Sequence, residues 1–415
     1  MKRRVVVTGI GAVSPNGIGR EAFWEATRSG ISGVRRISRF DPSQFAVQVA
    51  GEITGFDENR YVSPKDRPHV SRVTPLAIAA VAEALADSGL DSSAMSRDEL
   101  RQIGVIVGSG GGSQEFTEEQ YRLYYTGQQK QCSVYVIPTS TIGTLASEVS
   151  MRFGFRGFSH VISTGCTSST DAIGYAARQI QAGVIKTMVA GGVDAPIAPL
   201  ILRGFILMRI LASSWNSCPE RASRPFSKDR NGFVLGEGAW FFILEERERA
   251  LARGATIYGE IAGYGSTCEA YHRVRLEECG EEPARAMRMA IEEGEIDPEQ
   301  VAYVSYHGTS TELNDRIETR AMKLAFEKHA TRLPGSSLKS MIGHPQGACG
   351  AAGVAATLLA MRDSVAPPTV NVEVADPECD LDYVPEVGRK LSIEYAVANC
   401  IAFGSKNSAL LLRKI

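Results

Sequence analysis

Cys166 lies where a short β-branched run meets a glycine and gives way to a helical pattern. The letters VISTGCTSSTDAIGYA, residues 161–176, predict a strand, a sharp turn and a helix, with the thiol in the first turn of the helix. Unpaired backbone N–H groups and the positive end of the helix dipole favour a thiolate there, and a thiolate is a nucleophile. A small buried residue is the alternative, since free cysteines are among the most buried residues of proteins. This stretch by itself leaves both interpretations open.

Two of the six histidines also follow predicted strands. His307 comes directly after the strand pattern of residues 301–306, and His344 comes after a second strand pattern and before a Gly- and Ala-rich helical pattern. In an open α/β sheet, ligands gather at the carboxyl ends of the strands. Either histidine alone is more often a structural residue, but two histidines and Cys166 at equivalent strand ends indicate a reactive site.

A cysteine with histidines can serve a hydrolase, a thiol–metal site or an acyl-transfer enzyme. A metal site usually needs a fourth ligand; no acidic residue stands out for that place, and the eight cysteines form no CxxC pair, so we expect no metal. A cysteine protease uses one histidine as base, which leaves the second histidine and the nearby Lys339 without a role. Two neutral histidines that donate N–H bonds to one carbonyl oxygen suit a site that stabilises an enolate.

The composition excludes several classes of partner. The 45 basic and 47 acidic residues nearly balance, so neither a nucleic acid nor an anionic membrane surface is expected to bind. Scattered cysteines, the absence of a signal-peptide pattern and the absence of a long apolar run predict a reduced, cytoplasmic protein. A glycine-rich turn at residues 109–113 follows a strand pattern but contains neither GxGxxG nor GK[ST], which argues against nucleotide binding.

Strand and helix patterns alternate along the chain, which predicts an α/β fold with buried sheets. The clearest element is an Ala-rich helix over residues 73–88, closed by Gly89. We predict a strand over 336–339 and a small-residue helix over 347–363. Residues 114–140 are polar and rich in tyrosine, and we expect them to leave the core.

A boundary near Gly254 divides these patterns into two similar halves. Residues 1–254 carry Cys166, and residues 255–415 carry both histidines. The order of the patterns suggests a duplication, although sequence identity between the halves is too weak to establish it.

Three motifs resemble the catalytic motifs of β-ketoacyl-acyl-carrier-protein synthases: STGCTSSTDAIG with Cys166, YHGTSTELND with His307, and SSLKSMIGHPQGACGAAG with Lys339 and His344. The likeness runs the whole length, from VVVTGIGAVSPNG through RPFSKDRNGFVLGEGAW to PPTVNVEVADPECDLDYVP. It implies a thiolase fold, with two similar α/β halves in a five-layer αβαβα arrangement, and a dimer. The segments VISTGCTSSTDAIGYA and PECDLDYVP and residues 195–197 most resemble the ketosynthase alpha subunits of type II polyketide synthases. Those subunits pair with a chain-length factor that lacks the catalytic cysteine.

The resemblance implies a two-step reaction. Cys166 takes an acyl group from the phosphopantetheine arm of an acyl carrier protein, and malonyl-carrier protein then binds. His307 and His344 donate to the malonyl thioester oxygen and stabilise the enolate as carbon dioxide leaves. The carbanion attacks the Cys166 thioester, whose oxyanion is held by the backbone N–H groups of Cys166 and Phe403. No cofactor is implied beyond the arm that carries the substrates.

The resemblance also assigns roles to residues around this centre. Lys339 matches a catalytic lysine, and Asp315 and Glu318 match a supporting polar network. Thr309 and Thr311 match residues that contact the pantetheine arm. Basic residues stand at four positions where the family faces an acidic carrier protein: Lys65, Arg67, Lys130 and Arg209.

The sequence departs from the family pattern at three places. Gly353 stands nine residues after His344, where the family commonly has a glutamate. The gating turn contains Phe403 but reads AFGSKN over residues 402–407, so Ala402 and Lys406 are unusual there. Gly111 replaces a larger apolar residue common in fatty-acid enzymes, and we hypothesise that it opens the floor of the acyl pocket.

Several functions remain open within and beyond this resemblance. A homodimeric fatty-acid β-ketoacyl synthase II would use the same chemistry. A non-catalytic chain-length or scaffold partner is a different class, against which the intact cysteine and histidines argue. A degradative thiolase is disfavoured because its second reactive cysteine is not evident. Since the gating turn differs from that of aromatic-polyketide enzymes, we favour a reduced, polyene-like product.

Overall fold

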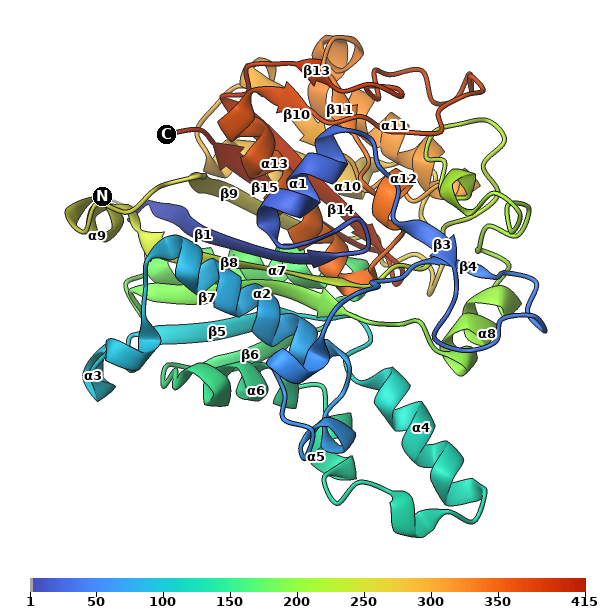
Figure 1. Cartoon of the computed structure of the whole chain (residues 1–415). Helices are drawn as coiled ribbons and strands as arrows, with labels where there is room; N and C mark the ends of the chain where they lie inside the picture. The colour runs from blue at the N-terminus through green and yellow to red at the C-terminus, as the bar shows by residue number, and fades with distance from the viewer. Residues whose placement is uncertain (1–2) are drawn as a thin grey trace.

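Two sets of five strands with the same internal order form the frame of the computed structural model, which describes residues 3–415 (Figure 1). The N-terminal set has the order β6 (Ser159–Ile162), β5 (Ile103–Gly108), β7 (Thr187–Asp194), β8 (Gly238–Glu246) and β1 (Val5–Ser14). The C-terminal set has the order β11 (Gly335–Ser336), β10 (Val301–Ser305), β14 (Tyr395–Ala402), β15 (Lys406–Arg413) and β9 (Gly259–Cys268). In both sets the first three strands are parallel, and the last two run antiparallel to their neighbours.

Strands β1 and β9 join the two sets edge to edge. They pair antiparallel over two positions, Val6 with Glu260 and Val7 with Gly259, so that one hydrogen-bonded path runs from β11 to β6. A repeated strand order is what a duplication produces. The division of the chain at residue 254 stays a prediction.

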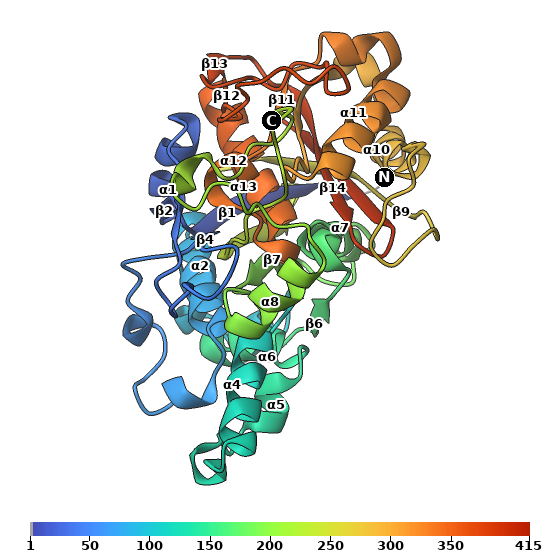
Figure 2. The same ribbon diagram turned by 90° about the vertical axis from the view of Figure 1, so that its right-hand side faces the viewer.

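Helices cover the strands in three layers, which gives the expected five-layer α/β arrangement (Figures 1 and 2). The central layer holds α7 (Ser168–Gln181) and α13 (Cys349–Asp363), which contact each other and strands of both sets. The outer layers hold α2 (Val73–Ser88) and α6 (Thr144–Phe153) over the N-terminal set, and α10 (Glu281–Glu293) and α11 (Glu312–Phe326) over the C-terminal set.

The two central helices consist largely of small residues because they must fit between two sheets. Every residue of α13 from Cys349 to Met361 is buried. The helices approach so closely that a Cβ on Gly350 would lie 2.0 Å from Oγ1 of Thr170 on α7. This contact places the start of α13 beside the start of α7, which Cys166 precedes.

The remaining elements are short or lie at the periphery. They are β2 (Gly17–Ile18), α1 (Arg20–Arg28), β3 (Val34–Arg36), β4 (Val49–Gly51), α3 (Arg97–Leu100), α4 (Gln114–Tyr125), α5 (Val136–Ser140), α8 (Pro199–Leu207), α9 (Arg247–Ala252), α12 (Lys339–Ile342), β12 (Val365–Ala366) and β13 (Arg389–Lys390). Among residues 3–415, no helix combines the length and the apolar composition needed to cross a membrane.

Most of the expected elements are present, with one clear error. The helix over 73–88 ends at Gly89, which adopts the left-handed conformation with φ of 71°. The segment 114–140 does leave the core, and α4 projects from the molecule (Figure 1). The predicted strand over 336–339 is wrong: β11 ends at Ser336, and Lys339 begins α12. The chain turns there because the backbone N–H of Ser337 donates to the Thr369 side chain rather than to a neighbouring strand.

Candidate active site

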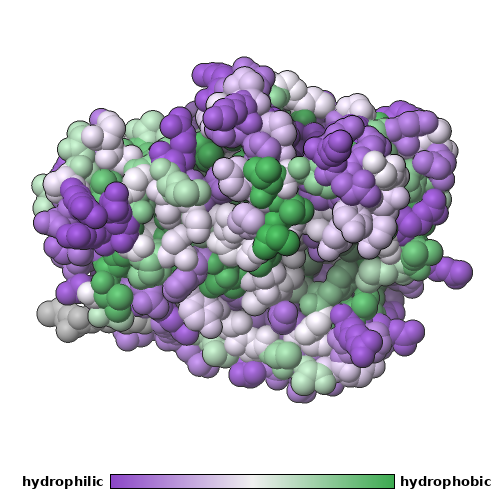
Figure 3. Space-filling model, turned by 90° about the horizontal axis from the view of Figure 1, so that it is seen from below, coloured by the Kyte–Doolittle hydropathy of each residue, from purple (hydrophilic) through white to green (hydrophobic). Residues whose placement is uncertain are grey.

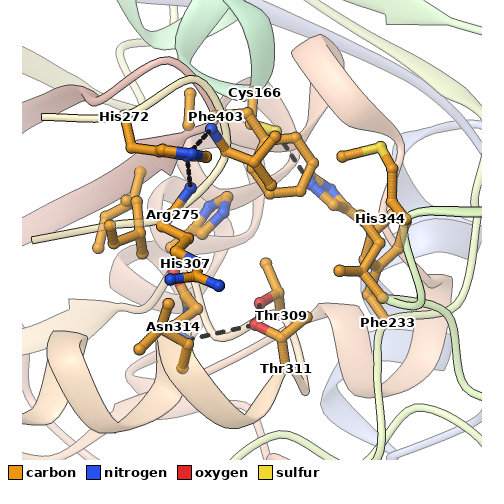
Figure 4. Close-up of a pocket in the computed structure, with 17 residues that line it drawn as sticks. Cys166, Phe233, His272, Arg275, His307, Thr309, Thr311, Asn314, His344 and Phe403 are labelled. Carbon is orange, nitrogen blue, oxygen red and sulfur yellow. Dashed lines mark hydrogen bonds between the residues drawn. The ribbon is translucent and has the colours of Figure 1, made fainter. Parts of the chain in front are cut away.

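A cavity of about 390 Å³ lies where strand ends of both sets meet, and Cys166, His307 and His344 all line it (Figure 4). Cys166 follows β6, His307 follows β10, and His344 follows α12, which itself follows β11. The structure therefore brings together the three residues that the sequence places after strands. Much of the wall is apolar and includes Met208, Ile210, Phe233, Val274, Leu276, Leu313, Ile401 and Phe403.

Cys166 lies in a single 3-10 turn, Gly165–Thr167, that leads into α7. Its side chain is buried, and Sγ lies 3.1 Å from Nε2 of His344. Burial raises the pKa of the Cys166 thiol, while the charge of Lys339 and a hydrogen bond from the backbone N–H of Phe403 act in the opposite direction. Burial therefore acts against the helix terminus, which favours a thiolate, so the protonation state of Cys166 stays a prediction. The imidazole of His344 is the neighbour of this thiol.

Both histidines of the cavity are neutral. Burial and the nearby Lys339 lower the pKa of His307 to about 3, and burial lowers the pKa of His344. The ring centroids lie 5.4 Å apart with the planes nearly perpendicular, so both rings border the same small volume. Two neutral imidazoles can each present an N–H donor to one oxygen without placing two positive charges side by side.

Lys339 lies behind His307. Its Nζ donates to the backbone oxygen of His307 over 2.5 Å and lies 3.4 Å from Nδ1 of the same ring. An ammonium group is only a donor, so Nδ1 accepts and the ring proton is on Nε2. Lys339 therefore both places the His307 ring and selects its tautomer.

The carboxylate of Glu318 holds the backbone of the loop after β10. It accepts hydrogen bonds of 2.7 Å from the backbone N–H groups of His307 and Gly308 and from Nδ2 of Asn399. Burial raises the pKa of Glu318 to about 7, although the hydrogen bonds from these three donors act to lower it. Glu318 acts on the backbone of His307 and has no hydrogen bond to its ring.

Asp315 holds the other end of this loop. It accepts from the backbone N–H groups of Phe226 and Ser310 over 2.8 and 3.2 Å, and Nε of Arg230 lies 3.5 Å from it. Burial raises its pKa, while the charge of Arg230 acts in the opposite direction. Asp315 therefore supports the loop that carries His307, at a distance from the cavity.

Thr309 and Thr311 line the cavity beyond His307. Their Oγ1 atoms lie 2.9 Å apart, and Oγ1 of Thr311 also caps α11 by accepting from the backbone N–H of Asn314 over 3.4 Å. The hydroxyl of Thr311 thus caps α11 at the cavity wall, and the hydroxyl of Thr309 is bonded to it.

The turn that carries Phe403 is tied to a neighbouring loop. Ser405 has a φ of 65° and lies between β14 and β15. Its Oγ accepts from the backbone N–H groups of Tyr271 and His272 over 3.3 and 3.2 Å, and donates to the His272 oxygen. Ser405 therefore binds the loop whose residues His272 and Arg275 line the cavity.

Gly111 does not line this cavity. Its backbone N–H donates to Asp194 over 3.0 Å, and a Cβ there would lie 3.2 Å from Oε1 of Gln114. Asp194 also accepts from the backbone N–H of Gly347 over 2.7 Å, so it ties the glycine-rich turn to the loop after His344. The role of Gly111 in an acyl pocket stays a prediction.

The four basic residues assigned to a carrier-protein surface also lie away from the cavity wall. Lys65, Lys130 and Arg209 are exposed, and Arg67 is partly buried and paired with Glu58. Arg209 is nearest in sequence to the residues of the cavity wall, since its neighbours Met208 and Ile210 line the cavity. Their binding role stays a prediction.

The glycine that replaces the family glutamate has a packing reason in this chain. A Cβ at Gly353 would lie 2.8 Å from Oγ of Ser305, at the end of β10. A larger side chain therefore requires Ser305 to move.

Sequence reasoning missed two cysteines and an asparagine around the site. Cys349 and Cys400 lie behind His307, each with its Sγ within 4.0 Å of Nδ1. Asn399 binds Glu318. Cys400 and Asn399 lie on the strand that leads to the gating turn. Their position just before Phe403 in the sequence is the feature that could have indicated that they lie near the site.

Comparisons with known proteins identify the family of this chain. Residues 2–250 match the family domain described as "Beta-ketoacyl synthase, N-terminal domain", and residues 258–373 match "Beta-ketoacyl synthase, C-terminal domain". A relative from Synechocystis sp., named 3-oxoacyl-[acyl-carrier-protein] synthase 2, is 40% identical over 100% of this chain and 98% of its own length. A Streptomyces virginiae protein with the provisional name polyketide beta-ketoacyl synthase 1 is 42% identical over 99% of this chain and 98% of its own.

Two solved structures share the whole fold. One is a type II polyketide ketosynthase in complex with its acyl-carrier protein and bound to the hexaketide, with a TM-score of 0.90, 32% identity and full coverage of both chains. The other is the ishigamide ketosynthase/chain length factor, with a TM-score of 0.92, 30% identity and full coverage of both chains. The fold is therefore the thiolase-like fold of ketosynthases. With its cysteine and two neutral histidines around one cavity, this chain belongs to the beta-ketoacyl synthase family.

Proposed function

We propose that this protein is the catalytic ketosynthase of a type II polyketide synthase, which extends an acyl chain by decarboxylative condensation with malonyl-acyl-carrier protein. The observation that carries the proposal is the meeting of Cys166, His307 and His344 in one cavity, with both histidines neutral and His344 within 3.1 Å of the thiol. A hydrolase has no use for the second neutral imidazole, whereas enolate stabilisation requires two donors to one oxygen.

The first step loads the acyl chain. Nε2 of His344 accepts the thiol proton as Sγ of Cys166 attacks the thioester carbonyl, and it then gives that proton to the pantetheine sulfur, which leaves as a thiol. The backbone N–H of Phe403 already points to Sγ of Cys166. It is therefore placed to donate to the oxyanion that forms on the carbon bound to that sulfur, together with the backbone N–H of Cys166.

The second step forms the carbon–carbon bond. The malonyl thioester oxygen accepts N–H bonds from His307 and His344, and the bond to the carboxylate breaks to release carbon dioxide. The electron pair left on the malonyl carbon attacks the acyl carbon on Cys166. The sulfur leaves as a thiolate, which takes one proton from solvent water to regenerate the Cys166 thiol. The product is a β-ketoacyl chain on the carrier protein.

The substrates arrive on a phosphopantetheine arm, and we propose no other cofactor. The hydroxyls of Thr309 and Thr311 line the cavity and suit the amides of that arm. The basic residues Lys65, Arg67, Lys130 and Arg209 are our candidates for contact with an acidic carrier protein. A cytoplasmic location fits such a substrate.

A partner subunit is part of the proposal. Figure 3 shows apolar side chains exposed on the face seen from below, the side on which α4, α5 and α6 lie in Figure 1. The exposed apolar residues of this region include Val134, Ile137 and Met151. Contiguous exposed apolar surface is typical of protein interfaces. We propose a chain-length-factor homologue as the partner, with a second copy of this chain as the alternative.

One reconstitution tests the proposal. The protein is incubated with malonyl-acyl-carrier protein and an acyl-carrier starter, with and without a candidate partner, and products are identified by mass. Extended β-keto or polyene-like chains that require the partner support the polyketide assignment. A single elongation by an active homodimer supports the fatty-acid alternative. Absence of acylation at Cys166 supports the non-catalytic scaffold.

A further inference from the structure

Two cysteines that the proposed mechanism does not use lie behind the His307 ring. Cys349 begins α13, and Cys400 lies on β14. Their Sγ atoms are 3.5 Å apart, and Nδ1 of His307 lies 4.0 Å from Cys349 and 3.4 Å from Cys400. All three side chains are at most 5% exposed. Three soft donor atoms therefore converge on one point inside the protein.

A fourth donor atom closes this group. The backbone oxygen of Cys166 lies 3.4 Å from Sγ of Cys349 and 3.1 Å from Sγ of Cys400. It faces the same pair of sulfurs from the turn that carries the nucleophile. Each of the two sulfurs therefore lies near both the imidazole nitrogen and this carbonyl oxygen.

The distances among these donors are close to those around a bound metal ion. With metal–sulfur bonds near 2.3 Å and metal–nitrogen bonds near 2.0 Å, a tetrahedral site has sulfur–sulfur edges of about 3.7 Å and sulfur–nitrogen edges of about 3.5 Å. The sulfur–sulfur distance of 3.5 Å and the Cys400 sulfur–nitrogen distance of 3.4 Å are near these values, and the Cys349 sulfur–nitrogen distance of 4.0 Å is about half an ångström longer. A cation could therefore be accommodated with side-chain adjustments of that size.

We propose that His307, Cys349 and Cys400 form a binding site for one thiophilic d¹⁰ cation of the Zn²⁺ or Cd²⁺ type, with the Cys166 carbonyl oxygen as a weak fourth ligand. Thiolate and imidazole ligands select such ions over Mg²⁺ or Ca²⁺. Backbone carbonyl oxygen serves as a weak additional ligand in some sites of mixed imidazole and thiolate ligands.

The charges around the site are compatible with a divalent cation. Two thiolates neutralise it, and binding releases any proton that Cys349 and Cys400 still carry. Lys339 lies 3.4 Å from Nδ1 of His307, so a bound cation replaces Lys339 as the partner of that nitrogen. The stronger bond of Lys339, to the His307 backbone oxygen, is unaffected.

A second group of donors shares His307 and must be distinguished from the first. Cys166, His307 and His344 also lie close enough to hold an ion. That group faces the substrate cavity, whereas Cys349 and Cys400 lie outside the cavity wall. The spacing of residues 307, 349 and 400 matches no metal-binding sequence motif. For this reason the sequence pattern predicted no metal.

The test is a titration of the full-length, reduced protein with Cd²⁺ under nitrogen, followed by the thiolate-to-cadmium absorption band in the ultraviolet. The matched variants are Cys349→Ala and Cys400→Ala in the site, Cys166→Ala in the alternative group, and Cys379→Ala as a buried cysteine of a separate core cluster. Wild type, Cys166→Ala and Cys379→Ala are expected to bind one equivalent. Cys349→Ala and Cys400→Ala are expected to bind about 100-fold more weakly, because each loses one thiolate ligand.

Three outcomes overturn the proposal: equal affinity in all proteins, loss of binding in Cys166→Ala with retention in both site variants, or no charge-transfer band at one equivalent. Circular dichroism and thermal unfolding establish that each variant is folded. Where an alanine variant is not folded, Cys349→Ser or Cys400→Ser replaces it, since serine keeps the size but supplies no thiolate. Co²⁺ is the second probe, since a four-coordinate site gives it intense visible bands that are absent in the site variants.

Discussion

Sγ of Cys166 lies 3.1 Å from Nε2 of His344, although the two residues lie 178 positions apart in the sequence. Burial raises the pKa of the thiol and lowers the pKa of the imidazole, so it favours the neutral form of both groups. Transfer of the proton from Sγ to Nε2 creates a thiolate–imidazolium pair, which burial disfavours until the thiolate attacks.

Alkylation of Cys166 should depend on pH and on His344. Because burial raises the pKa of the thiol, the rate of reaction with iodoacetamide should rise about tenfold per pH unit from pH 6 to 8, as the thiolate fraction does. His344→Ala should slow it at each pH because the proton acceptor is gone. Intact-protein mass measures the rate, and Cys166→Ala identifies the labelled site. A rate that is flat over this range would show a resting thiolate.

Lys339→Met should separate loading from condensation. The variant loses both contacts to His307, so the ring is no longer held with its proton on Nε2, and the pKa of His307 rises because Lys339 lowers it. Decarboxylation should fall by about 10²-fold, the usual contribution of a positioned proton donor. Acyl loading on Cys166 should change much less. Carbon dioxide release and acyl-enzyme mass report the two steps.

The control for that experiment is Lys323→Met, which removes an exposed lysine paired with Asp380. It should retain both steps. Equal losses of loading and decarboxylation in Lys339→Met would contradict a specific effect on His307.

Glu318 should make stability depend on pH. Burial raises its pKa from 4.5 to about 7, so the folded state holds the proton more tightly than the unfolded chain. Its contribution to stability is therefore complete below about pH 4.5 and is lost as the pH rises through about 7. Glu318→Gln cannot titrate, so the stability of wild type relative to this variant should fall by about 3 kcal/mol between pH 4.5 and 7.5.

Urea unfolding at both pH values measures this difference. Asp194, whose pKa burial raises to about 6, is present in both proteins, so its contribution cancels. Parallel stability curves for the two proteins would exclude the assigned shift.

Gly353 and Ser305 should be energetically coupled. A Cβ at residue 353 meets Oγ of Ser305 at 2.8 Å but Cβ of Ser305 at 3.7 Å, which is ordinary contact. Gly353→Ala should therefore destabilise the wild type by about 1–2 kcal/mol and the Ser305→Ala variant by much less. Denaturant unfolding of the four proteins gives the coupling energy. A coupling near zero would mean that Ser305 moves aside freely.

Gly111→Ile should change chain-length preference if Gly111 opens the acyl pocket. A side chain there would press on Gln114, whose Oε1 lies 3.2 Å from the position of a Cβ. Loading of Cys166 from short and long acyl-carrier proteins should then fall mainly for the long chains. Equal preference in wild type and variant would remove Gly111 from the pocket.

Local patterns in the sequence already determined a large part of this protein. The helix over 73–88 follows from its Ala-rich run and the glycine after it, and the strand, turn and helix around Cys166 follow from short-range periodicity. Such patterns are local, because backbone geometry is set by neighbouring residues. The same logic failed at residues 336–339, where a side chain from the distant Thr369 ends the strand.

Only the tertiary structure decided how the site behaves. The lowered pKa of His307 and the raised pKa values of Cys166 and Glu318 all arise first from burial, which depends on segments far apart in the chain. The meeting of Cys349 and Cys400 behind His307 has the same origin, since α13 and β14 reach it from different layers. Residue types and their order indicate the chemistry of this protein. Its protonation states depend on distances between side chains and on exclusion of solvent, and both arise only when the layers pack together.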